Sequence, residues 1–149
     1  MQIVKDNIKR VHALRGKIAL EVIALIIPTL NDSEEELREL CKFVASVGKD
    51  IPLHFSRFYP QYRMQNLPPT DEKTLLRAQE IAKEEGIGYA YIGNTSLPDV
   101  ENTYCPKCNA LLIKRDRYII EKNVFEKLNA EEKKNPKCPK CGYRINIVL

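Results

Sequence analysis

Long hydrophobic runs are absent from this 149-residue sequence. No apolar run reaches the ~18 residues that a membrane-spanning helix needs. The opening residues, MQIVKDNIKR, also lack the apolar core of a secretory signal peptide. We therefore expect a cytoplasmic protein with no membrane partner.

Cysteine is scarce before residue 105, where only Cys41 occurs. Cys41 falls on the apolar stripe of an expected helix, which predicts a buried core thiol. The other four cysteines form two C-P-K-C motifs, Cys105 with Cys108 and Cys138 with Cys141. Thiols stay reduced in the cytoplasm, and disulfide frameworks suit short secreted chains that lack a core. The two motifs therefore indicate a metal site.

A basic block is also missing, because lysines and glutamates are mixed along the chain. The formal net charge is +4, with 44% hydrophobic and 30% charged residues. This composition is typical of a globular chain with one sizeable core or two small ones. The charge favours nucleic acid only weakly, so a nucleic-acid partner is not expected.

Helical and strand-like patterns alternate through the first two thirds of the chain. An apolar run from Ile18 to Ile27, ended by Pro28, predicts a strand buried on both faces of a parallel sheet. Ser33 and Glu36 form a capping box that begins a helix, and Thr70 is a plausible cap for a later one. The expected elements are helix 3–15, strand 18–27, helix 33–47, strand 51–59, helix 71–85 and strand 87–93.

This order predicts an α/β fold in which three parallel strands alternate with helices. A complete barrel or doubly wound domain needs more strands, so the pattern favours a partial (β/α) barrel. The composition changes near residues 96–102, which predicts one domain over residues 1–96. Residues 97–149 would then form a linker and a small β module around the four cysteines.

The two C-P-K-C motifs have the features of metal-binding knuckles. Asn109 and Gly142 follow the second cysteine of each motif, and these residue types tolerate the left-handed conformation expected there. Four thiolates would form a closed, structural S₄ site of the zinc-ribbon kind. A redox motif of the glutaredoxin kind is the alternative, but it needs a preceding strand and a following helix.

The metal itself is open between zinc and iron. Both ions accept tetrahedral S₄ coordination, and the second motif also resembles the iron site of rubredoxins. Zinc is favoured because few aromatic residues are available to shield a redox iron: Tyr104, Tyr118, Phe125 and Tyr143.

Four segments together resemble the C-terminal half of radical SAM enzymes of the AmmeMemoRadiSam-system type, which are similar to pyruvate formate-lyase activating enzymes. The segments are LEVIALIIPTLNDSEEELRELCKFVAS, PLHFSRFYPQYRMQNLPPT, YAYIGN and ENTYCPKC. The resemblance covers nearly the whole chain and includes the terminal cysteine pairs.

This resemblance implies a partial (β/α) barrel that binds S-adenosylmethionine and a [4Fe-4S] cluster in the complete parent enzyme. The family's cluster motif, C-x-x-x-C-x-x-C, does not occur among the five cysteines, so no catalytic residue is assigned. Two positions depart from the family pattern: Thr29 stands where glycine usually follows the strand-ending proline, and Tyr59 where histidine is frequent.

The resemblance places two strands, Glu21 to Pro28 and Leu53 to Tyr59, against the nucleoside part of the cofactor. His54 and Ser56 share one face of the second strand, and polar side chains on a barrel strand favour the lumen and a ligand. The candidate cofactor-binding residues are His54, Ser56, Arg57 and Tyr59. The alternative is that His54 is a satisfied core histidine and that Arg57 ends the strand in water.

Three functional hypotheses follow. The chain is the C-terminal portion of a radical SAM enzyme, whose metal module covers the barrel, binds a protein substrate or relays electrons. Alternatively, it is a free-standing zinc-ribbon protein that binds nucleic acid or protein through residues 131–140 and 114–117. Thirdly, it completes a split enzyme by docking a missing barrel half or cluster-bearing chain at the edge of strand 18–27, an edge that would also support a homodimer.

Overall fold

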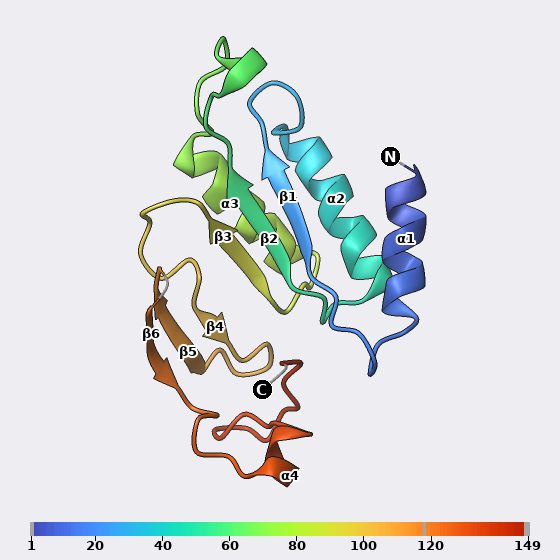
Figure 1. Cartoon of the computed structure of the whole chain (residues 1–149), viewed down its shortest axis with the longest axis vertical. Helices are drawn as coiled ribbons and strands as arrows, with labels where there is room; N and C mark the ends of the chain where they lie inside the picture. The colour runs from blue at the N-terminus through green and yellow to red at the C-terminus, as the bar shows by residue number, and fades with distance from the viewer. Residues whose placement is uncertain (1, 118, 148–149) are drawn as a thin grey trace. The chain divides into compact units, whose positions relative to one another are not determined.

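The computed structural model describes residues 2–117 and 119–147. The chain divides into two compact units, residues 1–95 and residues 96–149, each with its own sheet (Figure 1). The division adjoins the segment 96–102 in which the sequence predicts a boundary. Among the described residues, none of the helices combines the length and apolar character needed to span a bilayer.

The first unit holds three parallel strands in the order β1-β2-β3, and this confirms the predicted α/β class. Its strands are β1 (Val22–Ile26), β2 (Leu53–Arg57) and β3 (Ala90–Gly93). Its helices are α1 (Gln2–His12), α2 (Glu34–Val47), the 3₁₀ helix η1 (Tyr62–Met64) and α3 (Glu72–Glu84). The sheet is open, since β1 and β3 each have one paired neighbour in it.

Helices α2 and α3 cover one face of this sheet (Figure 1). Their apolar side chains and those of the facing strand positions are the core of the unit: Ile26, Leu37, Cys41, Val44, Leu53, Phe55, Leu75, Ala78, Ile81, Ala82 and Ile92. Cys41 is fully buried, as predicted, and burial raises the pKa of its thiol to about 11, with a smaller contribution from Glu85.

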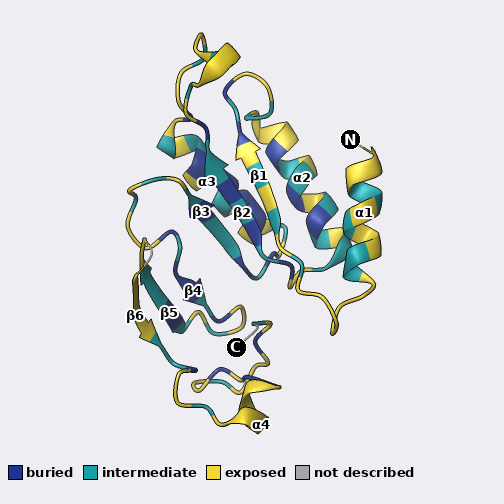
Figure 2. Ribbon diagram, viewed as in Figure 1, coloured by how far each residue is buried: buried dark blue, intermediate teal, exposed yellow. Residues whose placement is uncertain are grey.

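The opposite face of the sheet carries exposed apolar side chains, so the prediction that β1 is buried on both faces is wrong for the described chain. Ile23 is 71% exposed and Leu25 is 45% exposed, and Figure 2 shows the exposed stretch of β1. The reason is that α2 and α3 both lie on the other side. Register aligns Ile23 with His54, and Leu25 with Ser56, so all four belong to this open face.

Thr70 joins two strands and does not cap α3, in contrast to the prediction. Its hydroxyl donates to the Ile26 carbonyl at 2.6 Å and accepts from the Phe58 N–H at 2.9 Å, and the residue is fully buried. Asp71 caps α3 instead, accepting from the Lys73 N–H at 2.8 Å. A hydroxyl between two strand ends satisfies backbone groups that would otherwise be buried without partners.

Thr29 lies in the turn after β1 with a left-handed backbone, at φ 67°. Its N–H donates to the Asp32 side chain at 2.8 Å, and Asn31 bonds to the backbone of both Leu25 and Ile27. A β-branched residue is a rare occupant of this conformation because its Cβ meets the backbone. The turn therefore stores strain at the position where the resembling family has glycine.

We predict that Thr29→Gly raises the free energy of unfolding by about 1 kcal/mol, since glycine removes the left-handed penalty of an L side chain. Thr29→Ala is the matched control, because it keeps the Cβ. Urea denaturation measures both. Equal stability of the glycine and alanine variants would contradict strain at this turn.

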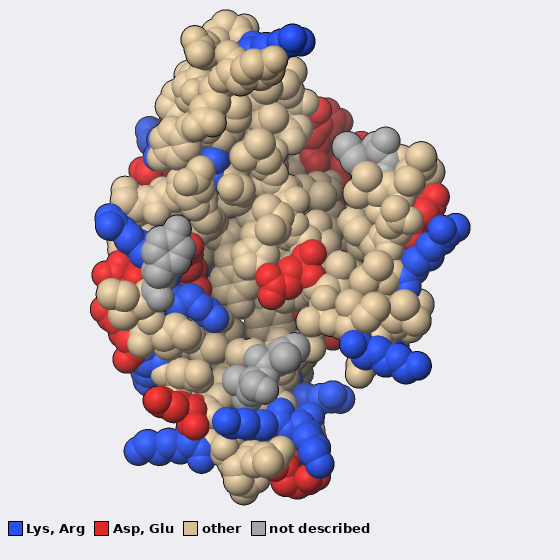
Figure 3. Space-filling model, viewed as in Figure 1, with Lys and Arg blue, Asp and Glu red and all other residues tan. Residues whose placement is uncertain are grey.

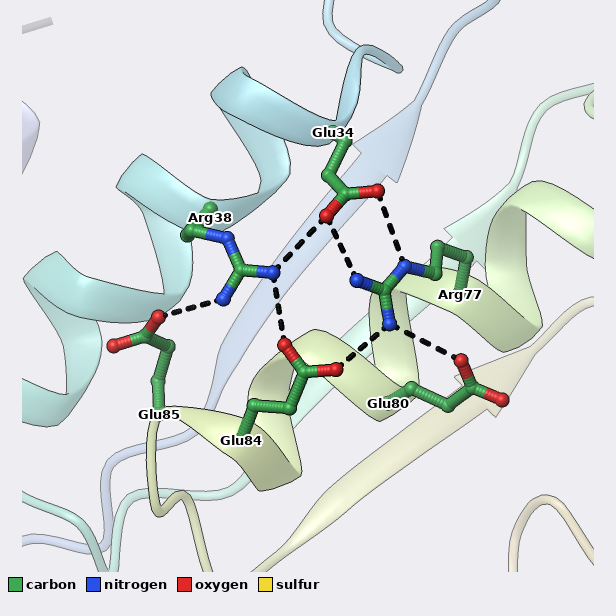
Figure 4. A network of polar contacts seen from close by, with 6 residues as sticks. All are labelled: Glu34, Arg38, Arg77, Glu80, Glu84 and Glu85. Atoms are coloured by element: carbon green, nitrogen blue, oxygen red, sulfur yellow. Dashed lines mark hydrogen bonds and ion pairs between the residues drawn. The ribbon is translucent and has the colours of Figure 1, made fainter.

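A network of two arginines and four glutamates joins α2 to α3 (Figure 4). The α2 residue Arg38 contacts Glu84 at 2.8 Å and Glu85 at 3.0 Å, both from the end of α3. In return Arg77 of α3 reaches Glu34 of α2 at 2.7 Å. The hydrogen bonds from Arg77 and then Arg38 lower the pKa of Glu34 from 4.5 to about 2.

This network should make the free energy of unfolding depend on pH in the acidic range. Because the folded-state pKa of Glu34 is depressed, its contribution is present above about 4.5 and is lost as the pH falls toward about 2. We predict that Glu34→Gln lowers the urea midpoint at neutral pH and that its difference from wild type shrinks in acid or high salt. Glu35→Gln, one residue along α2, is the control. A pH-independent difference would contradict the prediction.

The second unit is built around an antiparallel sheet in the order β4-β5-β6. The strands are β4 (Thr103–Tyr104), β5 (Leu111–Asp116) and β6 (Ile119–Asn123). The segment 129–137 contains the short helix α4 (Ala130–Lys133), which Asn129 caps. The buried apolar side chains are few: Val100, Leu112, Ile113, Phe125 and Ile145.

Candidate metal centre

The two C-P-K-C motifs fold into matching backbone turns. In the first, the Asn109 N–H donates to the Cys105 carbonyl at 2.9 Å, and the Cys105 N–H donates to the Ala110 carbonyl at 2.9 Å. In the second, Gly142 donates to Cys138 at 2.9 Å and Cys138 donates to Tyr143 at 2.8 Å. The predicted left-handed residues are confirmed.

Those two residues, Asn109 and Gly142, have φ values of 55° and 70°. The chain reverses there, and the reversal turns both sulfurs of a motif to the same side. The geometry therefore follows from the residue that comes after each second cysteine.

The four sulfurs of Cys105, Cys108, Cys138 and Cys141 lie within 4.8 Å of one another. Across the motifs, Cys105 Sγ is 3.7 Å from Cys141 Sγ, and Cys108 Sγ is 3.7 Å from Cys138 Sγ. A Zn–S distance of about 2.3 Å gives a tetrahedron with edges of about 3.8 Å. The donor set and its spacing therefore fit one tetrahedral metal ion.

Cys105 and Cys138 are each 1% exposed, while Cys108 and Cys141 are half-buried. All four positions of a tetrahedral ion would be taken by protein sulfur, which is the arrangement of a structural site. No helix begins directly after Cys108 or Cys141 in the part of the chain that the structure describes, since β5 follows the first motif. The setting that a glutaredoxin-like redox motif needs is therefore absent there.

The surroundings of Cys138 favour the thiolate that a metal requires. Burial raises its pKa, but hydrogen bonds from the backbone of Cys141 and Lys140, with those from Cys108 and Cys105, lower it to about 7. The Ala110 backbone also donates to Cys108, although burial and the neighbouring thiols leave the pKa of Cys108 raised. A cation among the four sulfurs would remove this competition for protons.

The aromatic residues considered for an iron site differ widely in solvent exposure. Phe125 is 1% exposed, Tyr104 is half-buried and Tyr143 is 43% exposed. Tyr118 lies outside the described residues.

We predict that Cys138→Ala abolishes stoichiometric metal binding and unfolds the second unit, because a site with three thiolates is open and a unit of this size has little core. Cys41→Ala is the control: it should keep the metal and perturb only the first unit. Metal analysis and amide NMR of residues 96–147 measure both. A folded second unit after complete chelation would contradict the prediction.

The candidate cofactor residues fall into two groups. His54 and Ser56 lie on the open face of the first sheet, with Tyr91 beside His54 in register. The His54 and Tyr91 rings stack at 5.0 Å between centroids and 30° between planes. His54 Nε2 lies 3.0 Å from the Glu21 carboxylate, yet it makes no aligned hydrogen bond among the described residues.

Arg57 and Tyr59 form the second group, at the carboxyl end of β2. Arg57 donates to the Thr70 carbonyl at 2.9 Å, to Glu72 at 3.0 Å and to the Tyr59 hydroxyl at 3.2 Å. These bonds use the Nε and Nη1 groups of the guanidinium, so Arg57 is held by the chain's own groups and is not a simple strand end in water. Glu21 and Tyr91 both lie in segments that carry the resemblance, but neither was singled out as a candidate site residue from the sequence.

Among curated proteins, the chain is 45% identical over 133 residues to an uncharacterized protein of Methanocaldococcus jannaschii. The match covers 89% of this chain and 38% of that protein, so the chain spans about two fifths of the length of its relative. No family model matches the chain. No solved structure matches it either.

Proposed function

We propose that this chain forms the C-terminal portion of a radical SAM enzyme, with three βα elements of a partial (β/α) barrel and a zinc-binding tail. The observation that carries the proposal is the open face of the first sheet. Parallel strands are normally covered on both faces, whereas here Ile23 and Leu25 remain exposed beside His54 and Ser56. A sheet with such a face and an unpaired β1 edge calls for completion by further strands.

A barrel arrangement accounts for both kinds of residue on this face. In a barrel the helices lie outside and the opposite face lines the lumen, where aliphatic side chains fill space and polar ones meet a ligand. The longer relative supports the proposal, because a closely similar sequence occurs there within a larger protein. The missing strands would come from another segment or from a separate cluster-bearing chain.

The residues of this chain fit the two cofactors of the parent family unequally. The four paired sulfurs suit a single ion, and no cysteine spacing suits a [4Fe-4S] cluster, so the cluster must be held elsewhere. S-adenosylmethionine, when bound, supplies the 5′-deoxyadenosyl group of this chemistry. His54 and Ser56 could hold its nucleoside, with Tyr91 and Glu21 orienting the imidazole. The zinc would fold the tail.

The test is anaerobic purification of the protein from its own cells through a tag, followed by incubation with dithionite and S-adenosylmethionine. We expect iron–sulfur absorption in the purified assembly and release of 5′-deoxyadenosine, measured by chromatography. His54→Ala should raise the KM for S-adenosylmethionine about tenfold, as expected for the loss of about 1.4 kcal/mol of contact.

Lys83→Ala is the control for that variant, since Lys83 is exposed on α3, which lies on the covered side of the sheet. It should leave both the KM and the yield of 5′-deoxyadenosine unchanged. Purified protein without iron–sulfur absorption and without S-adenosylmethionine cleavage would refute the proposed function.

A further inference from the structure

The net positive charge of the chain belongs entirely to the second unit. Residues 96–149 hold 11 of the 24 Lys and Arg but 7 of the 20 Asp and Glu, which leaves 13 of each sign in residues 1–95. The mixed order of lysines and glutamates along the sequence suggests an even spread of charge, but the net charge is concentrated in the second unit. Figure 3 shows Lys and Arg gathered over the part of the second unit that carries α4.

Part of this charge stands at the metal-binding turns. Each motif places a lysine directly before its second cysteine, Lys107 and Lys140, and the sulfurs of the two motifs are within 4.8 Å. Lys137 pairs with Arg144 in a β-bridge beside the second motif. We call these four cations, together with Tyr143, the knuckle surface.

The cations of the knuckle surface are exposed and make no ion pair among the described residues. Two other lysines of the unit differ: Lys114 contacts Glu121 at 2.7 Å and Lys134 contacts Glu131 at 2.7 Å. Zn²⁺ with four thiolates carries two negative charges, which two lysines would offset. Four cations exceed that need, so the surface retains positive charge for an anionic partner.

Tyr143 adds an aromatic ring to these cations. It follows Gly142, its carbonyl accepts from the Cys138 N–H at 2.8 Å, and its side chain is 43% exposed. The backbone bond holds the residue at the metal-binding turn, and the next residue, Arg144, is exposed as well. An exposed ring adjacent to cations in the sequence suits an unpaired base, which stacks while lysines contact the phosphates.

We propose that the knuckle surface binds single-stranded nucleic acid without strong sequence preference, through phosphate contacts from its four cations and base stacking on Tyr143. A duplex fits less well, because its bases are stacked on one another. An acidic protein would satisfy the charges but would leave the ring without a partner of its own. The proposal does not depend on the radical chemistry proposed above.

The test is fluorescence anisotropy of a labelled oligouridylate titrated with the full, zinc-loaded chain. With about four phosphate contacts on a single strand, affinity should fall about fifty-fold between about 50 and about 200 mM salt. Lys107→Gln with Lys140→Gln should weaken binding and flatten the salt dependence by about 1.4 in logarithmic slope. Lys42→Gln with Lys83→Gln in the first unit removes the same charge and should change little.

The ring is tested by Tyr143→Leu and Tyr143→Phe. Leucine should weaken binding about tenfold through the loss of stacking, whereas phenylalanine should retain it. Zinc content is measured for every variant, so that lost binding is not confused with a lost metal. Because Tyr143 contributes only its carbonyl to the turn, both variants should keep the ion.

Three results would overturn the proposal. One is no anisotropy change at low salt. Another is identical binding by the leucine and phenylalanine variants. The third is equal competition by polyglutamate of matched charge, which would assign the surface to acidic proteins. The 5′-deoxyadenosine assay reads out the proposed function separately, so failure of either idea leaves the other standing.

Discussion

The approach of four cysteine sulfurs to within 4.8 Å is the constraint on which the second unit depends. Thiolates at such distances repel one another, and four thiols so close compete for hydrogen-bond partners. A cation resolves this by attracting all four, and it links the turn at Cys105 to the turn at Cys138, which are far apart in sequence. The apolar core around Leu112 and Phe125 is too small to enforce that approach alone. Metal binding at these sulfurs would therefore be coupled to the folding of this unit.

The first unit has the opposite character, because its own residues complete one side of it and leave the other unfinished. On the helical side, apolar side chains of α2 and α3 pack on the strands. The Thr70 hydroxyl bonds to backbone groups at two strand ends, and ion pairs of Arg38 and Arg77 join α2 to α3. On the other side, Ile23 lies exposed in the same sheet row as His54 and Tyr91. The four sulfurs of the second unit could be held together by an ion, and the exposed face of the first unit leaves room for covering structure.

What could be predicted from the sequence was local. The turns at Asn109 and Gly142, and the capping box of Ser33, involve residues within a few positions of one another, so spacing determines them. The prediction that β1 is buried on both faces was wrong because an apolar run shows only that a strand can be buried. The placement of α2 and α3 decides which face is covered. Thr70 is similar: its bond to the Ile26 carbonyl depends on two strands ending side by side. The stacking of Tyr91 on His54 is a matter of sheet register, which no local pattern reveals.

The distribution of charge shows why a division into units alters a functional interpretation. Summed over the whole chain, a net charge of +4 among mixed lysines and glutamates gives only weak support for an anionic partner. Once the boundary is placed at Thr95, the first unit is neutral and the excess lies in the second unit, which carries the four cysteines. Lysines there serve two purposes that compete: they offset the charge of the thiolates, and they present positive charge to solvent. Because an S₄ site with Zn²⁺ needs only two such charges, the surplus of Lys137 and Arg144 beside an exposed Tyr143 is better explained by a partner than by the metal.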